Sequence, residues 1–335
     1  MLKEAIYKLI RKEDLLEEEM FAAMNQIMAG EATPALIGSF LTALRIKGET
    51  IDEITGAARA MRQNARKLPG TIPGLIDTCG TGGDNSRTFN ISTTVAFVLA
   101  GAGLRVAKHG NRAMSGKCGS ADLLEALGVK VDHGPEEVAS CIKKTGIGFL
   151  FAPVFHTAMK HALGPRKELG FRTIFNLLGP LTNPAEADYQ IVGVFDRELT
   201  APLAEVLGRL GVRRCMVIHG AGGLDELSLA GPNHAVYFDG NYLAEMVIYA
   251  EELGLVQADN AALVGGDARE NARITLEVLS GKPGPHRDVV LLNAAAAFYV
   301  AGLVENLRAG VELARASIDS GAAMDRLQQL QRMAM

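Results

Sequence analysis

The sequence predicts an α/β protein in which a small N-terminal all-helical domain precedes a larger domain with a mainly parallel central sheet covered by helices. Residues 1–70 contain only amphipathic helical patterns, whereas the chain from residue 71 onward alternates short apolar runs with helical segments. The stretch from Asp288 to the C-terminus is rich in Ala and Leu and predicts helices throughout. We therefore expect a helical domain at 1–70 and an α/β domain at 71–335, and a segment near 165–185 could pack back on the helical domain.

The expected helices of the first domain have recognisable starts and stops. An apolar stripe that we interpret as core packing is formed by Leu16, Met20, Met24, Ile27 and Met28. Gly30 follows this stripe as a stop signal. Thr33 and Pro34 then supply a cap and a first-turn proline, and Thr50 with Glu53 forms a capping-box pattern. The spacing predicts a small helical bundle.

The strands expected in the second domain are short apolar runs separated by helical segments. The runs are LIDTC at 75–79, LRVAK at 104–108, GFLFAP at 148–153, YQIVGVF at 189–195, CMVIHG at 215–220 and AVYFDG at 235–240. Helices are expected between them at 95–103, 121–128, 136–144 and 199–211. Such alternation is typical of a parallel sheet buried on both faces.

The bulk composition excludes several classes of protein. The formal net charge is −4, so the chain lacks the basic balance of a protein that binds nucleic acid or a membrane surface. The four cysteines have no metal-ligand spacing and predict neither a zinc site nor a disulfide framework, which favours a reducing compartment. No signal-peptide pattern or long apolar run is present. We expect a cytoplasmic protein with no nucleic-acid or membrane partner.

The first stretch with a chemical signature is DTCGTGGDNSRTFNISTT, residues 77–94, between a predicted strand and a predicted helix. Glycines there allow the backbone to approach a phosphate closely, and a helix N-terminus attracts anions. The dinucleotide fingerprint does not fit, because its third glycine would fall at Asn85. A tight turn with polar caps is the alternative interpretation. The polar residues Asp84, Thr88, Asn90, Ser92 and Thr93 favour a ligand site.

The second stretch is KHGNRAMSGKCGSAD, residues 108–122, again directly after a predicted strand. It is not a Walker A loop, because five residues separate Gly110 from Gly116 and Cys118 stands where Ser or Thr would hold magnesium. Its cationic and amide side chains predict a loop for phosphate or pyrophosphate, with a solvated basic loop as the alternative. These side chains are Lys108, His109, Asn111, Arg112 and Lys117.

Two further stretches contribute an arginine and a pair of acids. In HALGPRKELGFRTIFNLLGPLTNPA, residues 161–185, Gly-Pro pairs indicate loops, and Arg166, ahead of Arg172, is the candidate partner of a carboxylate. In HGAGGLDELSL, residues 219–229, Asp225 and Glu226 follow a glycine-rich turn and could engage two magnesium ions bridged by pyrophosphate. Alone, the first stretch is equally a plain connector and the second an exposed acidic pair that begins a helix.

Together these stretches resemble the anthranilate phosphoribosyltransferase family over essentially the full length of the chain. The shared motifs are GTGGD at 80–84, TFNIST at 88–93, KHGNR at 108–112, GSADLLEALG at 119–128, FAPVFHTAMK at 151–160, LGPR at 163–166, FNLLGPLTNPA at 175–185 and LDE at 224–226. The resemblance implies transfer of the phosphoribosyl group of phosphoribosyl pyrophosphate to the amine of anthranilate, in tryptophan biosynthesis. It also implies the use of Mg2+, with two ions expected, and a homodimer formed through the helical domain.

The resemblance assigns roles to individual residues. Those implied for phosphoribosyl pyrophosphate are Gly80, Gly83, Asp84, Thr88, Asn90, Ser92, Thr93, Lys108, Asn111, Arg112, Ser115, Gly116 and Ser120. Those implied for anthranilate are Gly80, Asn111 and Arg166, and those implied for the metal are Ser92, Asp225 and Glu226. Two departures from the family pattern are Ser115-Gly116, where paired serines are common, and Arg87, where a small residue is common.

Two other functions are compatible with parts of the sequence. A pyrimidine nucleoside phosphorylase resembles the family in fold, but it would favour a KHSGR-like loop and has no use for the pair Asp225-Glu226. A non-catalytic relative that binds nucleic acid would have lost the glycine and metal motifs and would have gained a basic face. The intact motifs and the negative net charge oppose both alternatives.

Overall fold

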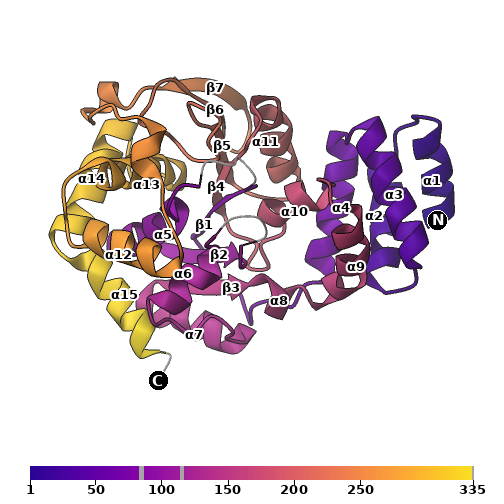
Figure 1. Ribbon diagram of the computed structural model, residues 1–335, viewed down its shortest axis with the longest axis horizontal. Coiled ribbons are helices and arrows are strands. Elements are labelled where there is room, and N and C mark those ends of the chain that lie inside the picture. The colour runs from indigo at the N-terminus through magenta and orange to yellow at the C-terminus, as the bar shows by residue number, and fades with distance from the viewer. Residues whose placement is uncertain (83–86, 114–116, 334–335) are drawn as a thin grey trace.

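A helical bundle forms one end of the molecule in the computed structural model, which describes residues 1–82, 87–113 and 117–333 (Figure 1). Its helices are α1 (Leu2–Ile10), α2 (Glu17–Met28), α3 (Pro34–Lys47) and α4 (Ile51–Gln63). Thr33 Oγ1 accepts a hydrogen bond from Leu36 N–H at 3.4 Å, and Thr50 and Glu53 form the predicted capping box. The local start signals therefore operate as the sequence predicts.

The methionine stripe of α2 is buried, with one exception. Met20, Met24, Ile27 and Met28 are buried as predicted, whereas Leu16 is 65% exposed and the prediction for it is wrong. Leu16 occupies the N-cap position, where its backbone N–H donates to Glu19 Oε2 at 3.0 Å. A residue in front of the first turn does not share the direction of the helical stripe, so its side chain faces solvent.

A seven-stranded sheet forms the centre of the larger part, in the order β3-β2-β1-β4-β5-β6-β7. The strands are β1 (Leu75–Gly80), β2 (Arg105–Gly110), β3 (Ile147–Phe151), β4 (Tyr189–Gly193), β5 (Arg214–His219), β6 (Asn233–Phe238) and β7 (Leu243–Ile248). The first five strands pair in parallel, and β6 and β7 are antiparallel additions at one edge. The six predicted strands are present, and the predicted fold class is confirmed.

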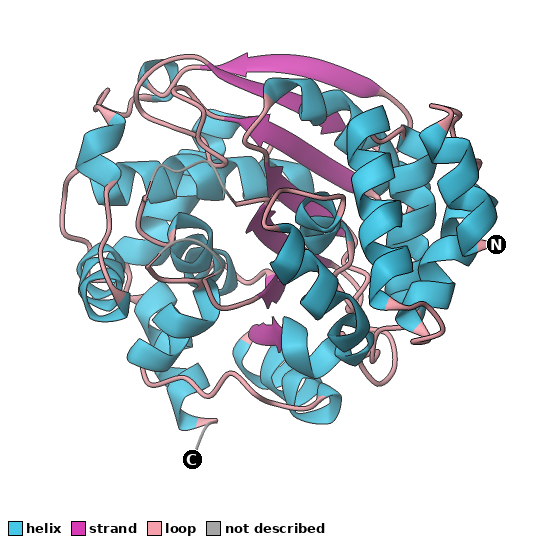
Figure 2. Ribbon diagram, turned by 45° about the vertical axis from the view of Figure 1, so that its right-hand side comes forward, coloured by secondary structure: helices cyan, strands magenta, loops and turns pink. Residues whose placement is uncertain are grey.

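The helices that follow β1 lie mostly on the two faces of the sheet (Figure 2). They are α5 (Ile91–Gly101), α6 (Ser120–Ala126), α7 (Pro135–Thr145), α8 (Ala152–Phe155), α9 (Lys160–Leu169), α10 (Phe175–Leu181), α11 (Thr200–Arg209), α12 (Ala268–Leu279), α13 (Pro285–Ala301), α14 (Leu307–Asp319) and α15 (Ala322–Arg332). Short 3₁₀ turns lie at Thr157–Met159, Arg197–Leu199, Glu251–Leu253 and Asn260–Leu263. None of the helices in the described ranges is both long and apolar enough to cross a membrane.

The alternation of side chains along the central strands separates two hydrophobic cores. Ile191 packs in a core with α5 and α13, whereas the next residue, Val192, packs with α11 on the other face. This second core continues into the bundle, because it also contains Met24 and Phe40. The bundle and one face of the sheet therefore share one buried surface, while the domain boundary near residue 70 stays a prediction.

Two Gly-Pro pairs that the sequence assigns to loops lie inside helices instead. Pro165 is within α9 and Pro180 is within α10, so the loop prediction for this region is wrong. Both helices pack against the bundle, where Ala162 and Leu178 are fully buried. Proline has a helical φ and removes one backbone hydrogen bond, a loss that the burial of these short helices outweighs.

A buried arginine joins the bundle to the rest of the molecule. Arg62, near the end of α4, donates from Nε to the carbonyl oxygen of Leu181 at 2.8 Å. Its Nη1 donates to the carbonyl oxygen of Leu210 at 2.9 Å. Carbonyl groups at the C-terminal end of a helix have no intrahelical hydrogen-bond partner, and Arg62 supplies one at the ends of α10 and α11. Burial lowers the pKa of Arg62 to about 10.

Candidate active site

The carboxyl ends of β1 and β4 meet the segment that carries the acidic pair. A Cβ atom on Gly80 would lie 2.3 Å from Asp225 Oδ2, and one on Gly193 would lie 1.5 Å from the Asp225 carbonyl oxygen. Asp225 Oδ2 also accepts a hydrogen bond from Gly82 N–H at 2.7 Å. The close approach of Asp225 thus requires glycine at Gly80 in the first motif and at Gly193 in β4, in addition to any ligand.

Glu226 faces the start of α5. Its Oε1 accepts a hydrogen bond from the backbone N–H of Ser92 at 3.1 Å. Burial raises the pKa of Glu226 to about 8, and repulsion from Asp225 adds to this rise, whereas Lys108 and Ser92 oppose it. The two carboxylates belong to a segment between β5 and β6 that is not helical, so the alternative of an acidic pair that begins a helix is wrong.

Lys108 lies beneath the same edge of the sheet. It is 3% exposed, and its Nζ donates to the carbonyl oxygen of Thr78 and to Ser92 Oγ, the latter at 3.3 Å. Burial lowers the pKa of Lys108, and the nearby carboxylates of Asp77 and Glu226 oppose this effect. A cation, two acids and the N-terminus of a helix therefore converge on the ends of β1 and β2.

Asp77 also belongs to this charge cluster, although no sequence motif predicts a role for it. It is fully buried in β1 and accepts hydrogen bonds from His109 N–H at 3.2 Å and from Asn183 Nδ2 at 2.7 Å. Burial raises the pKa of Asp77, whereas Lys108, Asn183 and His109 favour its charged form. A carboxylate within a predicted central strand is itself a signal of function, because such positions are otherwise apolar.

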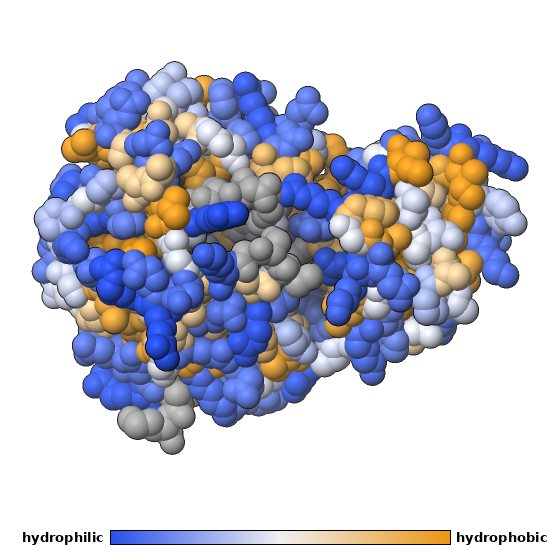
Figure 3. All heavy atoms as spheres, viewed as in Figure 1, coloured by the Kyte–Doolittle hydropathy of each residue, from blue (hydrophilic) through white to orange (hydrophobic). Residues whose placement is uncertain are grey.

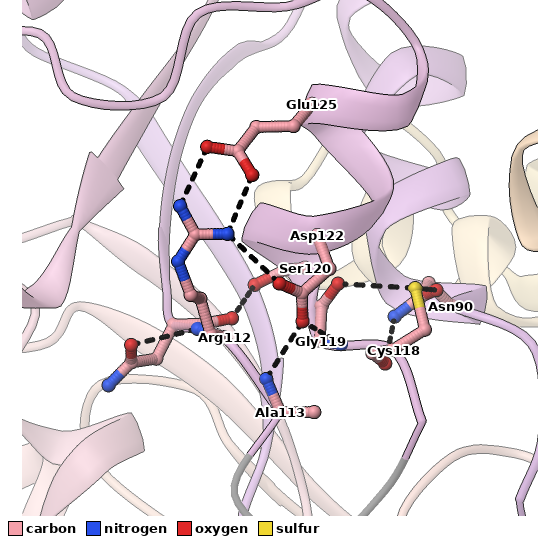
Figure 4. Close-up of polar contacts among 9 residues, drawn as sticks. Asn90, Arg112, Ala113, Cys118, Gly119, Ser120, Asp122 and Glu125 are labelled. Carbon is pink, nitrogen blue, oxygen red and sulfur yellow. Dashed lines mark hydrogen bonds and ion pairs between the residues drawn. The ribbon is translucent and has the colours of Figure 1, made fainter. Parts of the chain in front are cut away.

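The connection between β2 and α6 folds back on α6. The Asn111 carbonyl oxygen accepts hydrogen bonds from Ser120 Oγ and Ala121 N–H, each at 3.2 Å. Arg112 binds Glu125 through two nitrogens at 2.6 and 2.7 Å and also contacts Asp122 at 3.1 Å (Figure 4). The Arg112 guanidinium therefore pairs with two carboxylates of α6, and its implied role toward phosphoribosyl pyrophosphate stays a prediction.

Asn90, the N-cap residue of α5, connects three segments. Its Nδ2 donates to the Cys118 carbonyl oxygen at 3.1 Å, and its Oδ1 accepts from Cys118 Sγ at 3.2 Å (Figure 4). The same Oδ1 accepts from Asn271 Nδ2 at 2.9 Å. Asn271 lies on α12, too distant in sequence for any motif to predict the contact.

The remaining residues of the first two motifs lie nearby or outside the described ranges. Thr88 forms a β-bridge with Val264, and Thr93 is buried in the first turn of α5. Arg87 has a φ of 55°, a conformation that favours glycine, so this departure from the family pattern is conformationally costly. Gly83, Asp84, Ser115 and Gly116 lie outside the described residues.

Arg166 lies apart from this cluster, on α9. Its guanidinium stacks on Phe175 at 4.8 Å from the ring centroid, and burial lowers its pKa. Within the described ranges it forms no ion pair and makes no hydrogen bond with the residues at the strand ends. A partly buried arginine that pairs with no carboxylate of the described ranges is suited to bind a carboxylate from a ligand.

His109 of the second motif and His156 are both buried, with ring centroids 5.0 Å apart. Burial lowers the pKa of His109 to about 3, with a further decrease from His156. Burial likewise lowers the pKa of His156 to about 4. Both rings are therefore neutral in the folded protein near neutral pH.

These histidines predict an acid-sensitive fold. Below about pH 6.5 the two histidines bind protons in the unfolded chain but not in the folded protein. The free energy of unfolding is therefore highest above that pH, and it decreases as the pH falls toward the folded-state pKa values of His109 and His156. We expect His109→Gln to remove about 2 kcal/mol of the decrease in unfolding free energy between about pH 7 and pH 5. Urea unfolding at both pH values measures this change, with half-buried His161→Gln as the control. An unchanged pH dependence in His109→Gln would contradict it.

The acidic pair and Ser92 fit magnesium. They supply hard oxygen ligands, and a divalent cation would offset both the burial and the repulsion from Asp225 that raise the pKa of Glu226. Within the described part of the chain no three His, Cys, Asp or Glu side chains form a cluster that could enclose a metal. This donor set suits Mg2+, which keeps several waters and shares its coordination with substrate phosphates.

Comparisons with known proteins identify the family of the chain. Residues 3–65 match the model of the glycosyl transferase family helical bundle domain, and residues 73–324 match that of its a/b domain. The fold and the site thus define a glycosyl transferase built from these two parts. A protein of Moorella thermoacetica named anthranilate phosphoribosyltransferase is 57% identical over 328 residues, covering 98% of this chain and 97% of its own length. The chain belongs to the anthranilate phosphoribosyltransferase family.

Solved structures give the same result. The crystal structure of anthranilate phosphoribosyltransferase from Thermus thermophilus has a TM-score of 0.94 and 48% identity, covering 98% of this chain and 99% of that chain. The enzyme from Saccharomyces cerevisiae, in complex with PRPP (phosphoribosyl pyrophosphate) and Mg, has a TM-score of 0.91 and 29% identity, covering 99% of this chain and 97% of that chain. The similarity therefore includes both the bundle and the α/β part.

Proposed function

We propose that this chain transfers the phosphoribosyl group of phosphoribosyl pyrophosphate to the amine of anthranilate, in tryptophan biosynthesis. The products are N-(5-phosphoribosyl)anthranilate and pyrophosphate. The observation that carries the proposal is the convergence of Asp225, Glu226 and Lys108 on the glycine-lined end of β1 and the start of α5. Such a convergence provides for a metal-bound polyphosphate, and the family to which the chain belongs supplies the acceptor.

The difficult step is the departure of pyrophosphate from ribose C1. Negative charge develops on the departing oxygens, and Lys108, whose Nζ contacts Ser92 Oγ at the start of α5, is proposed to stabilise it. Ser92, Asp225 and Glu226 would hold magnesium, with two ions proposed. When bound, magnesium would neutralise pyrophosphate charge and lower the barrier to its departure.

The acceptor is oriented by the chain's own residues rather than activated by a strong base. The anthranilate amine is largely neutral and attacks C1 directly, with inversion expected there. Arg166 is proposed to bind the anthranilate carboxylate, because its partly buried guanidinium stacks on Phe175 and no carboxylate within the described ranges pairs with it. Holding amine and C1 in line supplies part of the rate enhancement.

A genetic experiment tests the proposed function. The chain is expressed in a bacterial strain that lacks its own anthranilate phosphoribosyltransferase and is grown without tryptophan. Growth is expected with the wild-type chain and not with a variant that lacks both Asp225 and Glu226 carboxylates. Absence of growth with abundant, folded wild-type protein would count against the proposal.

We also propose a homodimer formed through the bundle. Hydrophobic residues are exposed at the bundle end of the molecule (Figure 3), and they include Tyr7 at 66%, Ile10 at 65% and Ile46 at 73%. Tyr7 and Ile10 lie on α1 and Ile46 lies on α3, and these two helices pack against each other. Exposed apolar side chains on neighbouring helices favour an interface at this end of the molecule. Cytoplasmic location likewise remains our proposal, supported by four free thiols.

The dimer proposal predicts a specific change in molecular mass. The double variant Ile10→Glu, Ile46→Glu is expected to be monomeric, because two charges would be buried without partners in the interface. Sedimentation velocity measures the mass, and Val247→Glu on the exposed face of β7 is the control that stays dimeric. A monomeric wild-type chain, or a dimeric double variant, would contradict the proposal.

A further inference from the structure

Residues 263–267, which lead into α12, form hydrogen bonds with the first motif although the two segments are far apart in the chain. This contact is called the brace below. Phe89 N–H donates to the Leu263 carbonyl oxygen at 3.0 Å, and Gly265 N–H donates to the Arg87 carbonyl oxygen at 2.9 Å. A Cβ atom on Gly265 would lie 2.7 Å from Phe89 Cα and 2.4 Å from Asn271 Oδ1. The glycine therefore permits direct contact between this segment, the first motif and Asn271.

Within this brace, Asn271 determines the orientation of the Asn90 amide. Asn271 is 1% exposed, and its Oδ1 accepts a hydrogen bond from Gly266 N–H at 2.7 Å. Because a backbone N–H fixes that oxygen, Asn271 Nδ2 must be the atom that donates to Asn90 Oδ1, at 2.9 Å. The opposite orientation of Asn90 would place two amide groups donor to donor.

The fixed Asn90 amide in turn holds the second motif. Its Nδ2 donates to the Cys118 carbonyl oxygen, and Cys118 Sγ donates to the Asn90 oxygen that Asn271 also binds (Figure 4). A rotation of the Asn90 amide would face its oxygen toward the Cys118 carbonyl, acceptor to acceptor. One half-buried amide, that of Asn90, therefore sets the distance between the start of α5 and the residues that precede α6.

We infer that Asn271 is a positioning residue for phosphoribosyl pyrophosphate, which acts through Asn90 and Cys118 and touches no substrate itself. This inference rests on the proposed function, in which both motifs contact the same substrate. Asn90 lies two residues before Ser92, and Cys118 lies two residues before Ser120, so an error in their separation displaces both sides of the site. The expected consequence is weaker binding of phosphoribosyl pyrophosphate, because both motifs are proposed to contact this substrate.

The variant Asn271→Asp isolates this role. Aspartate keeps the volume and still accepts from Gly266 N–H, but it presents an oxygen in place of the donor to Asn90 Oδ1. We expect the Kd for phosphoribosyl pyrophosphate to rise about tenfold, the magnitude of one lost hydrogen bond with an unsatisfied partner. The KM for phosphoribosyl pyrophosphate is expected to rise in parallel, with kcat nearly unchanged.

The matched control lies one turn further along α12. Thr275 is fully buried, and its Oγ1 forms a hydrogen bond with Thr94 Oγ1 at 3.1 Å, so Thr275→Val removes a buried contact between α12 and α5 without touching Asn90. Thr275→Val is expected to lower the melting temperature and to leave the Kd unchanged. A merely structural Asn271 would give the same pattern in both variants.

Isothermal titration calorimetry with phosphoribosyl pyrophosphate and Mg2+, in the absence of anthranilate, measures the Kd of each full-length protein. A tenfold weaker Kd in Asn271→Asp alone supports the inference. A Kd equal to that of Thr275→Val overturns it while the proposed function stands. Should Asn271→Asp fail to fold, Asn271→Ser, which cannot reach Asn90, is judged by the same comparison. A wild-type chain that binds no phosphoribosyl pyrophosphate overturns the proposed function as well.

Discussion

Replacing both acidic residues, as Asp225→Asn with Glu226→Gln, is expected to lower kcat/KM by about 10³-fold, because the site then loses its anionic metal ligands and part of its pyrophosphate stabilisation. The amides preserve the acceptors for Gly82 N–H and Ser92 N–H, so the two docking contacts persist. Burial raises the pKa of Glu226 to about 8, and a neutral side chain is therefore tolerated there without metal. Activity is measured by the loss of anthranilate fluorescence, and folding by thermal unfolding.

The matched control is another adjacent acidic pair. Glu251 and Glu252 lie on a short 3₁₀ turn, and Glu251→Gln with Glu252→Gln removes the same net charge from the surface. This variant is expected to retain wild-type activity. Equal activity in the two double variants would show that the acidic pair does not bind the metal.

The variant Arg166→Met is expected to raise the KM for anthranilate about 100-fold, the cost of losing a charge-assisted hydrogen-bond donor to a carboxylate. Methionine keeps an apolar stem against Phe175, so the stacking surface is largely preserved. The KM for phosphoribosyl pyrophosphate is expected to stay unchanged, because Arg166 makes no contact with the Lys108 cluster in the described residues. Steady-state kinetics with each substrate varied in turn measures both values.

Arg172 provides the comparison for this variant. It also stacks on an aromatic ring, that of Phe195, at 3.9 Å. Arg172→Met is expected to leave the KM for anthranilate close to that of the wild-type chain. A large increase in Arg172→Met together with a small one in Arg166→Met would reverse the assignment of the carboxylate partner.

The sequence predicts features that depend on neighbouring residues. The caps at Thr33 and Thr50 and the strands that precede the glycine and lysine motifs are local patterns, and the structure contains them. The edge strand β7 was missed, because most of its residues are exposed and it has no alternating buried face. The loop prediction for the two Gly-Pro pairs is wrong for a different reason, because the burial of α9 and α10 in the folded protein outweighs the turn preference of proline.

The candidate site shows the same limit. Motifs at strand ends predict that Lys108 and Asp225 lie near one edge of the sheet, because parallel strands bring their carboxyl ends together. They do not predict that Gly80 and Gly193 must be glycines for Asp225 to approach. Nor do they predict the role of Asn271, whose partner is 181 residues away in the chain. A contact between residues so far apart in the chain leaves no local pattern in the sequence.

The reaction itself tests the account most directly. Purified protein is mixed with anthranilate, phosphoribosyl pyrophosphate and Mg2+ in one tube and with thymidine and phosphate in another. We expect magnesium-dependent loss of anthranilate fluorescence in the first tube, release of pyrophosphate in equal amount, and no cleavage of thymidine in the second. Cleavage of thymidine without loss of anthranilate would contradict the account and would identify a nucleoside phosphorylase instead.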